Sequence, residues 1–409
     1  MIENPLFLEA TELDGALEIV NERICQSEDL HRRGQLPPAL YDDVLLLAAD
    51  ILPHVENQAE WVGLGLEICR EIQQTVECCG CPLSASMLHG LGYRCFAVRG
   101  FCEQAHVMGG FSRELDHLLF LAAGRKAEQA RRRPARCADY DLVCGLSGTL
   151  YYLLDCGCTR EERAILVSCI EYLLSLVQDT VLGGMAIPRF HRLPPGQSPG
   201  AFQQDVIWFG LAHGMLGPLI ALAKAHAKGF SVEGLEEGIE ILYRLYETYQ
   251  LADEHSVPCW PGAISPEEYW EGACRPERPC VPSSWCCGNL GILRGLQKAA
   301  GYMNWPERER TYLEAMKGFL AQDCTAYHLA GPSLCHGYSG LAAIQIGVYA
   351  VYEDPGLLTN LERNVKKVMD EYREANRKDS SLLTGSLGVA AALLPLQGRG
   401  RTGKLLMID

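Results

Sequence analysis

The residues whose types and spacing are best suited to chemistry are two cysteines and a histidine in two short glycine-rich segments. The first segment, residues 285–288, contains Cys286, and the second, residues 335–337, contains Cys335 and His336. Two thiolates and one imidazole are ligands that a catalytic zinc ion uses when its fourth position stays open for water or substrate. We therefore predict that these three side chains bind one zinc ion per chain.

Both segments belong to a unit that recurs along the chain, a Gly-x-x-Gly turn followed by an apolar stretch. The first glycines of five copies are separated by 69, 74, 49 and 48 residues, which leaves room for two helices in each interval. Self-similarity of this kind indicates an array of helical pairs, and glycine lets helix ends approach closely because it has no Cβ. The five copies begin at Gly145, Gly214, Gly288, Gly337 and Gly385, and a degenerate copy lies at residues 89–92.

The stretches between the turns must position these residues, and most of them have helical periodicity. Apolar residues recur three and four positions apart in 164–177, 235–246 and 312–320, which predicts helices that bury one face. Residues 183–204 and 252–284 are rich in proline and glycine instead, so we predict long connections there. Because long loops in a compact domain are usually functional, we expect both to lie near the site.

Composition indicates a single large domain over residues 1–409. Hydrophobic residues make up 48% of the chain, and no Ser/Gly-rich linker or charge block divides it. The apolar runs are shorter than the ~20 residues that span a bilayer, and residues 1–5 lack the basic start of a secretory signal. We therefore expect a cytoplasmic protein whose 19 cysteines are mostly buried free thiols. The net charge of −15 argues against a nucleic-acid partner.

Five short motifs follow one another in order: Asp141 with Gly145-Leu146-Ser147-Gly148, Leu211-Ala212-His213-Gly214, Trp285-Cys286-x-Gly288, Leu334-Cys335-His336-Gly337 and Leu383-Thr384-Gly385. This ordered set resembles the LanC-type lanthipeptide cyclases over roughly residues 85–395. The resemblance implies an all-α fold, an α/α toroid of inner and outer helices with the Gly-x-x-Gly turns around one mouth. It also implies a zinc ion at that mouth, held by Cys286, Cys335 and His336.

The resemblance further implies an activity and partners. Family members add cysteine thiols of a precursor peptide to dehydroalanine or dehydrobutyrine in the same peptide, which closes lanthionine or methyllanthionine rings. The implied substrate is a dehydrated precursor peptide with leader and core, and the implied setting is a complex with a dehydratase and a transporter.

Such an addition needs an activated thiol and a proton donor. A cysteine thiol has a pKa near ~8.5 and reacts as the thiolate, and zinc in an open site accepts the thiol as a fourth ligand and promotes its deprotonation. The addition leaves an enolate whose Cα must be protonated, a step suited to histidine. We predict His213, in the turn of another repeat, as this acid, and Asp141 as the carboxylate that accepts an imidazole N–H and fixes its tautomer.

The same residues have structural interpretations. The three predicted zinc ligands could be buried thiols and a hydrogen-bonded core histidine. His213 could cap a helix, and Asp141 could satisfy free N–H groups at a helix N-terminus.

The chain departs from the family pattern beside the predicted zinc ligands. Cys287 and Pro282 stand where family members commonly have tyrosine and arginine, so how the substrate and the enolate oxygen are held is in doubt. Arg275 or Arg278 could reach in from the same loop. We interpret Cys287 as a wall residue, with a third thiol ligand as the alternative.

Other clusters have weaker chemical meaning. The cysteines of 78–81 and 156–158 could form a second metal site, but incidental thiols are favoured because no histidine lies nearby. The basic stretch 125–136 could receive an acidic leader segment, and a solvated helix face is the favoured alternative.

Two other functions remain open. One is a zinc-dependent protein that binds or transfers thiols such as glutathione, and the other is a non-catalytic peptide-binding scaffold with a structural zinc ion. A structural site normally has four protein ligands, so the openness of the site separates catalysis from the scaffold.

Overall fold

The computed structural model describes residues 10–79, 84–88, 90–182, 184–190, 207–275, 281, 283–375, 379–397 and 401–409. Its α-helices are α1 (Ala10–Arg32), α2 (Tyr41–Ile51), α3 (Gln58–Cys79), α4 (Leu91–Ala105), α5 (Gly109–Arg131), α6 (Cys137–Tyr140), α7 (Leu146–Leu153), α8 (Arg160–Val177), α9 (Leu216–Ala227), α10 (Leu235–Thr248), α11 (Pro266–Glu271), α12 (Asn289–Tyr302), α13 (Pro306–Leu320), α14 (Tyr338–Tyr352), α15 (Leu361–Glu374), α16 (Ser386–Leu393) and α17 (Thr402–Leu405). Short 3₁₀ helices lie at Pro38–Leu40, Leu52–His54, Cys324–Tyr327, Pro355–Leu358 and Leu394–Gln397. The strands are β1 (Asp179–Leu182), β2 (Met185–Pro188), β3 (Ile207–Trp208), β4 (Leu251–Ala252), β5 (Pro258–Cys259) and β6 (Ala263–Ile264).

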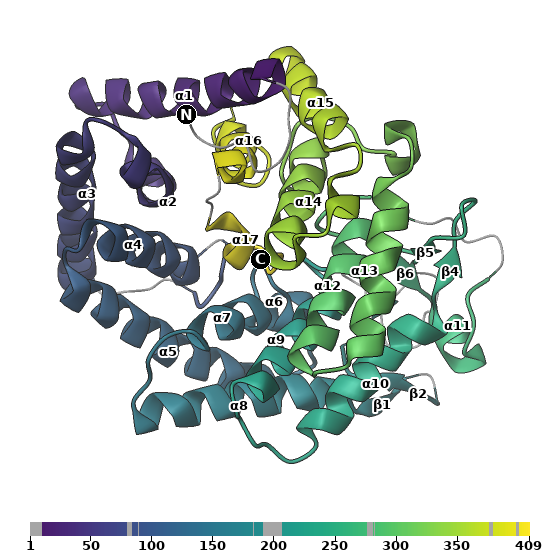
Figure 1. The fold of residues 1–409 in the computed structure, drawn as a ribbon. Helices are drawn as coiled ribbons and strands as arrows, with labels where there is room; N and C mark the ends of the chain where they lie inside the picture. The colour runs from purple at the N-terminus through teal and green to yellow at the C-terminus, as the bar shows by residue number, and fades with distance from the viewer. Residues whose placement is uncertain are drawn as a thin grey trace.

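The long helices form two concentric rings (Figure 1). The inner ring contains α2, α4, α7, α9, α12, α14 and α16, and the outer ring contains α1, α3, α5, α8, α10, α13 and α15. Neighbouring inner helices pack on one another and on outer helices, as α12 does against α9, α13 and α14. The predicted α/α toroid is therefore confirmed.

Burial explains why each helix belongs to its ring. The outer helix α10 buries Leu235, Ile239, Leu242 and Tyr246 on one face, as its spacing predicts, and leaves the opposite face exposed. The inner helix α12 is buried continuously over residues 289–300, which is typical of a helix surrounded by other helices.

Glycines let the chain enter the inner helices in tight turns. Gly145, Gly288, Gly337 and Gly385 are the N-caps of α7, α12, α14 and α16. The second glycine of a turn is equally constrained, because a Cβ on Gly291 would lie 2.2 Å from the carbonyl oxygen of the tryptophan that begins the turn.

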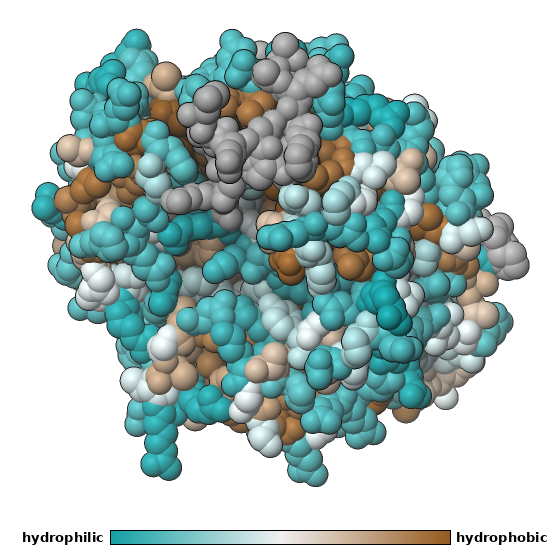
Figure 2. Space-filling view, viewed as in Figure 1, coloured by the Kyte–Doolittle hydropathy of each residue, from teal (hydrophilic) through white to brown (hydrophobic). Residues whose placement is uncertain are grey.

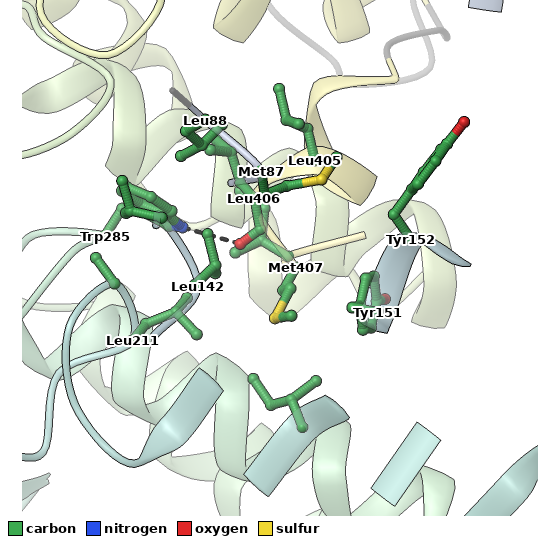
Figure 3. Packing of buried hydrophobic residues seen from close by; sticks show 14 of the residues in the cluster. Met87, Leu88, Leu142, Tyr151, Tyr152, Leu211, Trp285, Leu405, Leu406 and Met407 are labelled. Carbon is green, nitrogen blue, oxygen red and sulfur yellow. Dashed lines mark hydrogen bonds between the residues drawn. The ribbon is translucent and has the colours of Figure 1, made fainter. Parts of the chain in front are cut away.

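The segment after α16 packs at the centre of the ring. Figure 3 shows Leu405, Leu406 and Met407 among buried side chains from the mouth turns, with the Trp285 indole N–H donating to the Leu406 carbonyl at 3.1 Å. Arg294 of α12 donates from Nε to the Ile408 carbonyl at 3.1 Å. The inner helices thus have a packed centre beneath the turns.

The described parts of the two proline-rich connections contain short ordered elements. In the first, β1 pairs with β2 in a hairpin, and residues 191–206 lie outside the described ranges. In the second, α11 begins at Pro266 because Ser265 and Glu268 form a capping box and proline fits the first helical turn. β6 pairs antiparallel with β3, which brings the second connection beside the segment that leads to His213.

Hydrophilic side chains cover most of the face in Figure 2, with hydrophobic side chains between them. Among the described residues, 15 cysteines are free thiols, five of which are buried, whereas Cys259 is disulfide-bonded. Within the same ranges, no helix has the length and apolar character needed to cross a bilayer.

Candidate metal centre

Main-chain hydrogen bonds join the turns at the mouth to one another. The amide of Ala212 donates to the carbonyl of Cys286 at 2.8 Å, Cys286 to Cys335 at 3.2 Å, and Cys335 to Leu383 at 2.9 Å. The Leu142 amide donates in the same sense to the Ala212 carbonyl at 3.2 Å, so each amide donates to the carbonyl of the next turn along the chain. We call these five residues the turn belt. It fixes the spacing of the turns through backbone atoms, whatever side chains the turns carry.

The turn belt brings the predicted zinc ligands together. One ligand atom each of Cys286, Cys335 and His336 lies within 4.8 Å of the other two. The two cysteines are partly buried and His336 is exposed, so the set opens toward solvent on the imidazole side. Two sulfur donors and one nitrogen donor at this separation fit a tetrahedral zinc ion with one open position.

The two thiols differ in acidity because they share hydrogen bonds. A hydrogen bond from Cys286 lowers the pKa of Cys335. Hydrogen bonding with Cys287 lowers the pKa of Cys286, but hydrogen bonding with Cys335 and burial outweigh it and raise this pKa to about 11. Cys335 is therefore the more acidic thiol of the pair.

Cys287 lies at the edge of this set. Its Sγ is 3.7 Å from the Cys286 Sγ, and the Ser284 hydroxyl lies 3.5 Å from the same Cys287 sulfur. Its backbone packs on Gly210, where a Cβ would lie 2.7 Å from the Cys287 Cα. Cys287 thus lies next to both the Cys286 thiol and Gly210, in the segment that leads to His213. Arg275 is exposed, whereas Arg278 and Pro282 lie outside the described residues.

His213 and Asp141 form a hydrogen-bonded pair at the same mouth. The His213 Nδ1 is 2.7 Å from Asp141 Oδ2, and the two side chains are 49% and 2% exposed respectively. The other carboxylate oxygen, Oδ1, accepts from the amides of Cys144 at 2.6 Å and Gly145 at 2.7 Å. Asp141 therefore has two roles: one carboxylate oxygen accepts hydrogen bonds from the amides before α7, and the other orients the imidazole.

A third side chain, which the sequence analysis did not predict as part of the site, lies beside this pair. Cys137, the first residue of α6, places its Sγ 3.3 Å from Asp141 Oδ2 and 3.2 Å from the His213 carbonyl. The available signal was its spacing, because residues four apart share a helix face.

The basic stretch 125–136 has partners inside the protein. Arg133 forms two hydrogen bonds with the Asp139 carboxylate at 2.7 and 2.5 Å, which anchors α6. Lys126 donates to the Cys144 carbonyl at 2.5 Å, and Arg131 donates to Ser168 Oγ at 2.7 Å. Arg133 and Lys126 thus hold α6 and the turn before α7, whereas Arg131 connects α5 to α8.

A toroid of helical pairs with a sulfur and nitrogen donor set at its mouth defines the class of the protein. The family model of lanthionine synthetase C-like proteins matches residues 72–402. The chain belongs to this family.

Individual relatives agree with that membership. The nisin biosynthesis protein NisC of Lactococcus lactis subsp. lactis is 29% identical over 213 residues, which are 50% of this chain and 48% of that protein. The match thus spans about half the length of this curated relative. A solved structure of nisin cyclase superposes with a TM-score of 0.79 at 19% identity, covering 95% of this chain and 97% of that chain. This likeness shows that the fold is the same.

Proposed function

We propose that this protein is a zinc-dependent lanthipeptide cyclase. It adds cysteine thiols of a dehydrated precursor peptide to dehydroalanine or dehydrobutyrine and forms lanthionine or methyllanthionine rings. The observation that carries the proposal is the convergence of two groups on one mouth, the Cys286, Cys335 and His336 donor set and the Asp141–His213 pair, joined by the turn belt. Family membership and the name of the relative, a nisin biosynthesis protein, support it.

The donor set supplies the activation of the thiol. Cys286, Cys335 and His336 would hold the zinc ion, and the chemistry that it would supply is Lewis-acid activation of the substrate thiol, which would favour the thiolate at neutral pH with release of the thiol proton to solvent. Cys286 and Cys335 would hold such an ion with two negative charges, so a substrate sulfur would keep its nucleophilicity better than beside three neutral histidines. The exposed His336 leaves that side of the set accessible to a peptide.

His213 supplies the proton that completes the addition. Sulfur attack on the alkene forms the C–S bond and leaves an enolate, and the imidazolium of His213 donates a proton to its Cα. The buried Asp141 carboxylate, 2.7 Å from Nδ1, directs Nε2 toward the substrate and stabilises the positive charge before transfer. The Ala212–Cys286 hydrogen bond, at 2.8 Å, keeps the acid and the thiol site at a fixed separation.

The proposed partner is a precursor peptide with leader and core, delivered by a dehydratase in a complex that includes a transporter. We further propose a cytoplasmic location, which the predominance of free thiols supports.

A single reaction separates this proposal from the glutathione and scaffold alternatives. The zinc-loaded protein is mixed with a dehydrated peptide that carries one dehydroalanine and one cysteine, and unreacted thiols are alkylated and counted by mass spectrometry. Cyclisation protects the peptide thiol from alkylation at unchanged mass. If the thiol stays alkylatable while added glutathione is joined to the peptide, the protein transfers thiols. If neither reaction exceeds the rate without protein, it is a scaffold.

A further inference from the structure

The group formed by Cys137, Asp141 and His213 has the composition of a cation site. One ligand atom from each residue lies within 4.8 Å of the other two. Asp141 Oδ2 is 3.3 Å from the Cys137 sulfur and 2.7 Å from His213 Nδ1. We propose that these three side chains bind a second divalent cation of the zinc type, separate from the Cys286, Cys335 and His336 set.

Backbone contacts hold the three donors in place. Cys137 begins α6 and Asp141 is its C-cap, so the thiol and the carboxylate lie one turn apart on the same helix. Asp141 Oδ1 is occupied by two amide donors, which leaves Oδ2 toward the thiol and the imidazole. The bidentate Arg133–Asp139 pair anchors α6. The site is therefore built before any cation arrives.

The donor chemistry selects the cation. A thiolate with an imidazole and a carboxylate suits zinc or cobalt(II), whereas magnesium and calcium prefer oxygen ligands alone. Since the His213 side chain is 49% exposed, water would reach a cation held there. Binding releases the Cys137 thiol proton to solvent. A neutral His213 moves its Nδ1 proton to Nε2, and a protonated His213 releases it as a second proton.

Occupancy of this site would inhibit the enzyme, a consequence that rests on the proposed function. A histidine that binds a cation must be neutral, so His213 could no longer present the imidazolium that protonates the enolate. Zinc would then be required at the first site and inhibitory at the second. The second site should be the weaker, because it has one thiolate instead of two.

Zinc binding to the full chain tests the site without reference to activity. The parent, titrated with zinc alone, should bind two equivalents, and Cys137→Ala should bind one. Cys137→Ser should lose the second equivalent or weaken it at least tenfold, so that the test does not depend on one variant folding. Cys144→Ala is the matched control, since its thiol lies in the same turn outside the donor set, and it should keep both equivalents.

The absorption spectrum of the cobalt(II) protein and the rate of cyclisation provide two further measurements. The second cobalt equivalent should add a thiolate-to-metal absorption band that Cys137→Ala lacks. Excess zinc should slow cyclisation by the parent at least tenfold and leave Cys137→Ala unaffected. The proposal is overturned if the parent binds one equivalent at every zinc concentration, or if the second equivalent persists in both Cys137→Ala and His213→Asn. Because zinc stoichiometry does not depend on turnover, loss of the first equivalent in Cys286→Ala tests the proposed function separately.

Discussion

The amide of Cys286 donates a hydrogen bond to the carbonyl of Cys335 at 3.2 Å, so the two predicted thiolate ligands are joined through their backbones. The bond links α12 to α14, two inner helices whose turns are 49 residues apart in sequence. Its neighbours in the turn belt extend the connection to Ala212, next to the proposed acid. Since these bonds use no side-chain atoms, the proposed ligands and acid can be substituted without removing the contacts that position them.

Removal of either thiolate should abolish stable zinc binding at the first site. Cys286→Ala and Cys335→Ala each delete one of three donors, and loss of a direct ligand should weaken binding by more than the about 10- to 100-fold typical of outer partners. Metal analysis after dialysis measures the content. Cys158→Ala, an exposed free thiol elsewhere on the chain, should retain the parent zinc content. Full zinc stoichiometry in both ligand variants would refute the assignment.

Cys287 should be dispensable for the metal. Its sulfur lies at the edge of the donor set and meets Ser284, so Cys287→Ser and Cys287→Ala should keep zinc and most of the cyclisation activity. The cobalt-substituted protein provides the measurement, because each thiolate ligand contributes to the charge-transfer absorption. A weaker thiolate band in Cys287→Ala than in the parent would show that Cys287 is a third sulfur ligand.

Gly291 should be intolerant of a side chain. The added Cβ of Gly291→Ala would lie 2.2 Å from the Trp285 carbonyl oxygen, a rigid backbone atom in the turn that carries Cys286. We expect a loss of about 2–3 kcal/mol in the free energy of unfolding, as for overpacking, together with weaker zinc binding. Gly63→Ala in α3 is the matched control, because within the described part of the chain its Cβ would have no atom within 4 Å apart from its chain neighbours and the adjoining backbone of α3. It should be neutral or stabilise by about 0.5–1 kcal/mol. Equal unfolding midpoints in denaturant would contradict the packing argument.

The repeats in the sequence predict an array of helical pairs and the three-residue donor set, and the family resemblance adds the closure of that array into a toroid. The glycine turns mark where inner helices begin, and the apolar spacing of 235–246 and 312–320 marks the outer faces that are buried. The turn belt could not be predicted, since it joins main-chain atoms of residues that meet only when the ring closes. Cys137 was missed for a related reason, because its role depends on α6, a helix of four residues with no periodicity of its own.

In the proline-rich segment 252–284, proline content alone predicts the absence of a long helix but does not locate the short helix that forms there. Prolines exclude a long helix there, as predicted, but Pro266 begins α11 because the preceding Ser265 and the later Glu268 cap it. The capping pattern Ser-Pro-Glu-Glu was present in the sequence and would have located this helix.

The last prediction concerns proton transfer. His213→Asn should retain zinc at the first site, because His213 belongs to a different turn and a different donor set. It should cyclise a dehydrated precursor about a hundredfold more slowly or worse, which is the usual weight of general acid catalysis. Asp141→Asn should show a smaller defect, since the amide oxygen can still accept from the Cys144 and Gly145 amides while the charge facing the imidazole is lost.

The measurement is the rate at which precursor thiols become resistant to alkylation, with zinc content determined on the same samples. His226→Asn is the matched control, because His226 is also paired with a carboxylate, at 3.0 Å from Glu236, but lies at the far end of α9. The control should cyclise at the parent rate. His213→Asn should have a lower cyclisation rate than the parent at every substrate concentration, since proton transfer is part of the chemical step and not of binding. Cyclisation by zinc-loaded His213→Asn at the parent rate would leave His213 with a structural role only and assign the proton donor to another group at the mouth.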